Sequence, residues 1–112
     1  MVEHKIYWTQ FALNSLSEIH EYLLLQSGSE ELANKYVQKL LLKIEHLKQF
    51  SNSGTDEPFL KAIGQQSKFV LEGNYKIIYQ IQANQIFVTD VFHVKQNPQK
   101  IKTRNTPLKD NK

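Results

Sequence analysis

The clearest pattern in the chain lies near its C-terminal end, where two apolar stretches have the composition of paired strands. Residues 75–81 and 86–93 are both rich in β-branched and aromatic side chains, and only the short, mainly polar segment 82–85 separates them. Two such runs joined by so short a break are typical of an antiparallel β-hairpin. We expect the rest of the domain to pack on this hairpin.

Upstream of the hairpin, the spacing of apolar residues predicts two amphipathic helices. Over residues 10–26, and again from residue 30 to about residue 47, apolar side chains recur at intervals of three or four. Thr9 and Ser29 are suitable N-caps for these helices, and Gly28 is suitable for a left-handed C-cap between them. Because so few residues join the two helices, we expect them to lie antiparallel and to share a seam.

The remaining segments predict further short strands. Residues 2–8 alternate loosely and indicate a first strand, and residues 67–71 indicate another before a turn at 72–74. The polar residues 51–57 are typical of a loop, and residues 58–63 are expected to start in an extended conformation. The order β-α-α-β-β-β predicts an α+β fold, in which one antiparallel β-sheet packs against an N-terminal α-helical hairpin.

The distribution of charge divides the chain into a body and a tail. Its 112 residues support a single domain, which we expect to span residues 1–98. Residues 95–112 carry six basic and one acidic side chain, a net charge of +5, whereas residues 1–94 carry eight basic and ten acidic side chains, a net charge of −2. Residues 99–112 are therefore expected to form a basic, flexible tail. The body itself is not basic, which argues against a domain that binds nucleic acid mainly through phosphates.

Composition also excludes several kinds of site. The chain has no cysteine, so neither a disulfide nor a thiolate metal site is available. No apolar run resembles a signal peptide or is long enough to cross a bilayer, so we expect a cytoplasmic protein that does not associate with membranes. The histidines and glycines lack the spacing of metal-binding and phosphate-binding motifs, and we expect neither a metal nor a cofactor.

Lys76 and His93 are the most suggestive candidates for chemistry. If the hairpin turn at 82–85 has an even length, residue 82 lies opposite residue 85, and the numbers of every other opposing pair also sum to 167. Lys76 then lies opposite Val91, and His93 lies diagonally beside it on the same face of the sheet. A lysine there could stabilise charge on a phosphate, and a histidine could transfer a proton. The alternative is that both side chains only line an exposed or partner-covered face.

Other lysines could extend that face. A basic rim around it would comprise Lys61, Lys68 and Lys95. Isolated surface lysines more commonly serve solubility, and the face taken by Lys68 depends on whether the turn at 72–74 holds two or three residues. Tyr75 and Tyr79 alternate away from Lys76, so we expect them to fill the core beneath the helices.

Taken in order and spacing, several short motifs resemble the RelE/ParE superfamily of bacterial type II toxins, and its ParE branch more than its RelE branch. The resemblance covers nearly the whole domain. The matching motifs are Trp8 with Thr9, Ala12 with Leu16, Tyr22 with Leu23, Ala33 with the series Leu40, Ile44, Leu47 and Phe50, residues 73–79, Val91 to His93, and Pro98.

The resemblance implies a small toxin that is neutralised by a cognate antitoxin in a hetero-oligomer. ParE-like members poison DNA gyrase, whereas RelE-like members cut mRNA within the ribosome. An interface with the antitoxin is expected to cover apolar surface on the α-hairpin and at a sheet edge. The resemblance is therefore compatible with three functions. The chain could be a gyrase inhibitor without chemistry of its own, a ribosome-dependent endoribonuclease, or a non-toxic relative that only binds the antitoxin.

Several departures from the RelE branch count against the nuclease. The central-strand arginine of that branch is replaced by Lys76, and Gln96 and Lys102 stand where an arginine and a tyrosine are expected. The paired lysines that precede the central strand fall on Ser67 and Phe69, whereas Lys68 matches a basic residue common in the ParE branch. The residues expected to contact a target or partner are Lys61, Lys68, Lys76, His93, Lys95 and Gln96.

Overall fold

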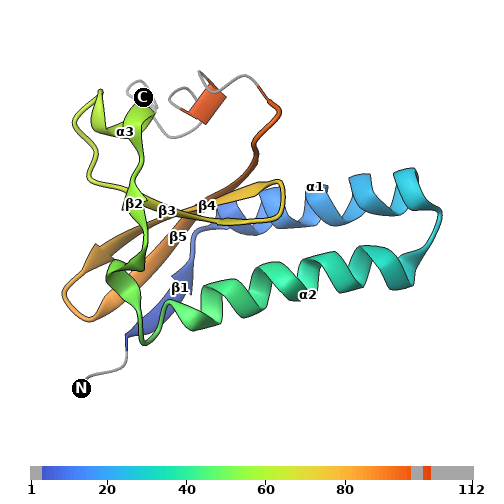
Figure 1. Cartoon of the computed structure of the whole chain (residues 1–112), viewed down its shortest axis with the longest axis horizontal. Helices are drawn as coiled ribbons and strands as arrows, with labels where there is room; N and C mark the ends of the chain where they lie inside the picture. Colours follow the sequence, from blue (N-terminus) through green and yellow to red (C-terminus); the bar gives the residue numbers. More distant parts are fainter. Residues whose placement is uncertain (1–3, 97–99, 102–112) are drawn as a thin grey trace.

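The computed structural model describes residues 4–96 and 100–101, and these residues form one sheet with helices on both of its faces (Figure 1). The elements in chain order are β1 (Lys5–Trp8), α1 (Gln10–Ser27), α2 (Glu30–His46), the 3₁₀ turn η1 (Ser51–Ser53), β2 (Thr55–Asp56), α3 (Pro58–Lys61), β3 (Lys68–Glu72), β4 (Tyr75–Gln82) and β5 (Gln85–His93). The predicted α+β fold with an N-terminal helical hairpin is confirmed.

The sheet is mixed rather than wholly antiparallel. Its strand order is β1-β5-β4-β3-β2, and β1 runs parallel to β5 while every other neighbouring pair is antiparallel. The expectation of a single antiparallel sheet is therefore wrong for β1. Tight turns force antiparallel pairing, but β1 leaves the sheet through a long helical hairpin, and that connection leaves its direction free.

Local sequence signals explain the helical hairpin. The Thr9 hydroxyl accepts a hydrogen bond from the Ala12 N–H at 3.1 Å, and the Ser29 hydroxyl accepts one from the Leu32 N–H at 3.2 Å, so both predicted N-caps are confirmed. Gly28 ends α1 in the left-handed conformation, with φ of 67°. Figure 1 shows α1 and α2 lying side by side and extending beyond the sheet.

Apolar side chains form a separate core on each face of the sheet. The larger core lies beneath the α-hairpin and includes Leu40, Tyr75 and Tyr79, as expected for the two tyrosines. A smaller cluster on the other face is made of Leu60, Ile78, Phe92 and Ile101. Ile101 is 1% exposed although it lies beyond the predicted domain boundary at residue 98. The division into domain and tail remains a prediction, and residues 102–112 lie outside the described residues.

The segment between α2 and β3 differs most from expectation. Residues 58–63 were expected to start extended, but Pro58–Lys61 form the short helix α3. The Glu57 carboxylate caps it by accepting hydrogen bonds from the Phe59 and Leu60 N–H groups at 2.7 and 3.3 Å. Proline is favoured at the first helical position because its missing N–H would be unpaired there in any case. Ahead of α3, η1 and β2 occupy the predicted loop and add a fifth strand to the sheet.

Among the described residues, none of the helices combines the length and the apolar character that crossing a bilayer requires.

Candidate functional site

A bulge in β5 separates the two residues that we expected to act together. Ile78 pairs with Asp90 but Tyr79 pairs with Val88, so Thr89 is an extra residue in the β5 ladder. Beyond it, the numbers of paired residues sum to 168 instead of 167, and Lys76 lies opposite Phe92 rather than Val91.

This shift changes which face each side chain takes. His93 now pairs with Tyr75, while Lys76 pairs with Phe92, and adjacent residues of a strand point to opposite faces. The expectation that Lys76 and His93 share one face is therefore wrong. A single inserted residue is enough to reverse the faces of all residues beyond it.

Lys76 is held in a contact on the face that is remote from the α-hairpin. Its ammonium forms an ion pair with Glu57 and lies 4.4 Å from the centre of the Phe69 ring. The Glu57 side chain is 0% exposed and that of Lys76 only 14% exposed. Because a carboxylate already neutralises the ammonium, Lys76 ties β4 to the start of α3, and its charge is not presented to a bound phosphate.

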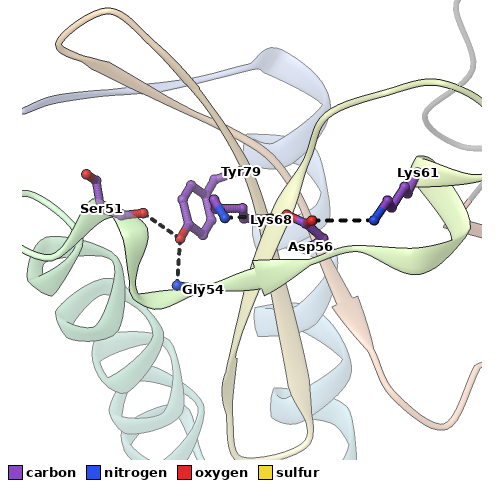
Figure 2. Close-up of polar contacts among 6 residues, drawn as sticks. All are labelled: Ser51, Gly54, Asp56, Lys61, Lys68 and Tyr79. Atoms are coloured by element: carbon purple, nitrogen blue, oxygen red, sulfur yellow. Dashed lines mark hydrogen bonds and ion pairs between the residues drawn. The ribbon is translucent and has the colours of Figure 1, made fainter.

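Lys61 and Lys68 come together at a different place, near the β2 edge of the sheet (Figure 2). Asp56 lies between them, with its carboxylate oxygens 3.8 Å from the Lys61 Nζ and 3.4 Å from the Lys68 Nζ. The turn before β4 holds two residues, since Glu72 pairs with Tyr75, and this places Lys68 opposite Tyr79. The two lysines line a hollow of about 590 Å³ whose other walls are mainly polar. With Asp56 included, the formal net charge of this site is only +1, from two lysines and one aspartate.

The Tyr79 hydroxyl binds the backbone of the segment that precedes β2, as Figure 2 shows. Its hydroxyl accepts a hydrogen bond from the Gly54 N–H at 3.1 Å and donates one to the Ser51 carbonyl at 2.8 Å. Burial raises the pKa of the Tyr79 phenol, and the hydrogen bond from Gly54 only partly opposes this. A Cβ on Gly54 would collide with this hydroxyl, so only glycine allows the close approach.

The other three candidate residues gather in a hollow of about 500 Å³ between α1 and the end of β5. The lining is formed by Ser15, Glu18, Ile19, Tyr22, Tyr75, Val91, His93, Lys95 and Gln96. His93, Lys95 and Gln96 therefore share one site, remote from Lys76. Residues of α1 form the rest of the lining of this hollow. Because they are distant from His93 in the sequence, no local sequence pattern indicated that they belong to the same site.

Aromatic rings shape this hollow. The His93 Nδ1 accepts a hydrogen bond from the Lys95 N–H at 3.0 Å, so in the neutral ring Nε2 carries the proton. The His93 and Tyr75 rings meet edge to face, with their centroids 5.0 Å apart. Burial raises the pKa of the Tyr75 phenol, and the nearby Tyr22 and Tyr36 raise it further. The hollow thus brings together phenol groups, the His93 imidazole and the Lys95 side chain.

The α-hairpin also leaves large apolar side chains in contact with solvent. Leu25 is 78% exposed and Leu42 is 66% exposed, and more of the same kind are Leu13, Tyr22, Leu32, Tyr36 and Leu41. Apolar exposure on this scale over a pair of helices is typical of a surface that a partner covers. The antitoxin interface expected from the sequence lies on the same α-hairpin, and that location stays a prediction.

Known proteins resemble this chain in sequence and in fold. The family model for the ParE toxin of the type II toxin–antitoxin system, parDE, matches residues 6–98. A solved structure from the chromosomal ParDE TA system of P. aeruginosa is similar with a TM-score of 0.70 and 21% identity, over 83% of this chain and 98% of that chain. At that level of identity the likeness shows the fold alone. Among curated proteins, none has a sequence that matches this chain.

Proposed function

The chain belongs to the ParE toxin family of type II toxin–antitoxin systems, and we propose that it inhibits growth by poisoning DNA gyrase in the cytoplasm. It would act by binding its target, without chemistry and without a cofactor. A cognate antitoxin would neutralise it in a hetero-oligomeric complex. The single observation that carries this proposal is the separation of Lys76 from His93, because the competing nuclease needs the two together.

A nuclease would require a cation and a proton-transfer group at the same phosphodiester. The two candidates lie on opposite faces of the sheet, and the Lys76 ammonium is already paired with the buried Glu57. Ser67 and Phe69 stand where the RelE branch has lysines, so they supply no replacement cation. These facts favour an inhibitor that binds a protein over one that cuts RNA.

The antitoxin part of the proposal is supported by the exposed apolar residues on the α-hairpin. Leu25, Tyr36 and Leu42 would lose most of their contact with water in a complex. Burying such surface is a main source of affinity between proteins, and aromatic residues often dominate it.

The proposal is tested with purified DNA gyrase and relaxed plasmid. We expect the chain to inhibit supercoiling and to trap cleaved DNA, and we expect added antitoxin to restore supercoiling. A parallel reaction with ribosomes and mRNA should show no toxin-dependent cleavage. Cleaved transcripts without gyrase inhibition would support the endoribonuclease instead, and activity in neither assay would support a non-toxic relative that binds the antitoxin.

A pair of variants identifies the surface that contacts gyrase. Lys95→Gln removes an exposed charge from the hollow that contains His93, whereas Lys35→Gln removes an exposed charge from α2 outside it. If the hollow contacts gyrase, Lys95→Gln raises the concentration needed for half-maximal inhibition severalfold, and Lys35→Gln leaves it unchanged. Equal effects of both would assign the loss to net charge alone.

A further inference from the structure

Two threonine hydroxyls bind the backbone at the bulge in β5. The Thr89 hydroxyl donates a hydrogen bond across the interrupted ladder to the Ile78 carbonyl of β4, at 3.3 Å. The Thr9 hydroxyl, at the start of α1, donates to the Val88 carbonyl at 3.2 Å, and the Thr9 N–H donates to the same carbonyl at 3.1 Å. Because a bulge disrupts the ladder locally, these side chains add directional hydrogen bonds where the strand is irregular.

Thr9 also joins this bulge to α1. The oxygen that donates its proton to the Val88 carbonyl accepts a hydrogen bond from the Ala12 N–H at 3.1 Å, and this second bond is the cap of the helix. One hydroxyl therefore has a partner in β5 and a partner in the first turn of α1. The direction in which α1 leaves the sheet is thus tied to the position of the bulge.

The two walls of the hollow that contains His93 begin at these two threonines. On one wall, the lining residues of α1 lie in the turns that follow Thr9. On the other wall, His93 lies in β5 a short way beyond Thr89. Because both walls start at the bulge, its geometry sets how α1 and the end of β5 face each other across the hollow.

The bulge also decides that His93 belongs to the hollow. With the extra residue, His93 pairs with Tyr75 and lies on the side of α1, whereas in a continuous ladder Phe92 would take that place. Phe92 is buried with Leu60 and Ile101 in the smaller core, so packing selects the bulged register. Apolar packing is not directional, however, and it leaves the exact twist of the strand beyond the bulge to the hydrogen bonds.

We propose that Thr89 and Thr9 are positioning residues of the surface that binds gyrase. Neither belongs to the lining of the hollow, so neither has to touch the target. Their hydroxyls fix the geometry of the bulge, and the bulge holds the His93 ring against Tyr75 and opposite α1. The inference rests on the proposed function, which supplies gyrase as the target of this hollow.

Substitutions of Thr89 test this inference against a matched control. Thr89→Val keeps the branched shape but removes the hydroxyl, and we expect the concentration for half-maximal gyrase inhibition to rise about fivefold, the factor that corresponds to one lost hydrogen bond. Thr89→Ser retains the hydroxyl and should restore inhibition. Thr55→Val removes an exposed threonine hydroxyl from β2, which β3 and β4 separate from β5, and it should leave inhibition unchanged. Thermal unfolding verifies that the variants are folded.

NMR spectra of the same variants distinguish positioning from a loss of stability. In the folded chain, the Tyr75 ring, with its centroid 5.0 Å from that of His93, shifts the signals of the His93 ring, and the hydrogen bond to His93 Nδ1 at 3.0 Å shifts the Lys95 amide signal. A variant that is only less stable keeps these shifts while it is folded. We expect Thr89→Val, but not Thr89→Ser or Thr55→Val, to move both signals toward their values in the unfolded chain, while the amide signals of α2 stay in place.

Thr9 is tested by a variant that separates its two roles. Aspartate is a good N-cap, but its carboxylate has no proton to donate to the Val88 carbonyl. Thr9→Asp is therefore expected to keep α1 capped and still to move the His93 and Lys95 signals, whereas Thr9→Ser should leave them in place. If Thr89→Val does not fold, Thr9→Asp provides the test of the inference.

The outcomes separate this inference from the proposed function. Weaker inhibition together with shifted signals, both absent in Thr89→Ser, supports the inference. If the unchanged chain does not inhibit gyrase, the proposed function is wrong, and the assignment of the threonines to a gyrase site is wrong with it. If the chain inhibits gyrase and Thr89→Val inhibits it equally well, only the positioning inference is wrong. The inference is also wrong if inhibition weakens while the His93 and Lys95 signals stay in place, because the hydroxyl then does not act through the hollow.

Discussion

The ion pair between Glu57 and Lys76 allows a sharp test of what stabilises the packing of α3 on the second face of the sheet, which is the face remote from the α-hairpin. The two carboxylate oxygens of Glu57 have different partners: Oε1 accepts the N–H groups that start α3, and Oε2 binds the Lys76 ammonium. The substitution Glu57→Gln keeps an oxygen for the backbone N–H groups but leaves Lys76 without a counter-charge. Lys76→Met removes the ammonium, retains an apolar chain over the Phe69 ring and leaves Glu57 as a buried charge.

The size of the effect follows from burial. Removing one partner of a buried ion pair typically costs about 3–5 kcal/mol. Lys76 keeps 14% of its side chain in water, which would partly solvate the unpaired ammonium. We therefore expect Glu57→Gln to lower the free energy of unfolding by about 2–3 kcal/mol. Lys76→Met should cost a similar amount, on the order of 3 kcal/mol, because Glu57 is fully buried. The double variant has no buried charge and should cost clearly less than the sum of the two.

Urea denaturation of the four proteins measures this coupling as a double-mutant cycle. For a domain of this size, about 2 kcal/mol corresponds to a fall in Tm on the order of 10 °C, which thermal unfolding detects independently. Lys68→Met is the matched control, because its ion pair with Asp56 at 3.4 Å is solvent-exposed and should contribute about 0–1 kcal/mol. If the single costs of Glu57→Gln and Lys76→Met simply add in the double variant, the buried ion pair does not stabilise the fold and the reasoning is refuted.

Three further predictions concern stability and are checked by denaturation. Tyr79→Phe removes the hydroxyl that bridges Gly54 and Ser51, and we expect a loss of about 1–3 kcal/mol because two buried backbone groups lose their partner; a change below about 0.5 kcal/mol would contradict this bridging role. Thr9→Ala removes the cap of α1 and should cost about 1 kcal/mol, whereas Thr9→Ser should cost much less, and equal losses would show that the hydroxyl is not the cause. The raised pKa values of Tyr75 and Tyr79 mean that the unfolded chain loses these protons first, so the stability that these two tyrosines contribute should be present below pH 10 and be lost above it. Urea unfolding between pH 8 and pH 11 should show this fall (about one proton per tyrosine), and Tyr75→Phe should make it shallower.

Features set by short-range interactions could be predicted from the sequence. Thr9, Gly28 and Ser29 act on backbone groups within four residues, so the side chain and the chain direction alone decide their roles. The β4–β5 hairpin was equally accessible, since its apolar runs and its turn are adjacent. The family resemblance rested on the same local motifs, and the family match confirms it.

Features that depend on distant packing could not be predicted in this way. The bulge at Thr89 is a single extra residue in a continuous apolar run, and nothing in the composition of residues 86–93 distinguishes it. It nevertheless decides that Lys76 and His93 face opposite ways. The ion pair of Lys76 with Glu57 joins residues 19 positions apart through the helix α3, for which only Pro58 gave a local signal. The hollow that contains His93 needs α1, more than 70 positions upstream in the chain.

The role of Lys76 also determines how toxicity data should be interpreted. A central-strand cation invites substitution by alanine, and loss of growth inhibition would then be taken as loss of a contact with gyrase or RNA. Because Lys76 is paired with Glu57 inside the fold, Lys76→Ala would leave a buried carboxylate and reduce the folded population, with the same loss of activity. The double variant with Glu57→Gln and Lys76→Met separates these causes, since it lacks the cation but has no unpaired buried charge. If this variant is folded and still inhibits gyrase, Lys76 acts only through stability. If it is folded but inactive, the face of the sheet that carries Lys76 contacts the target.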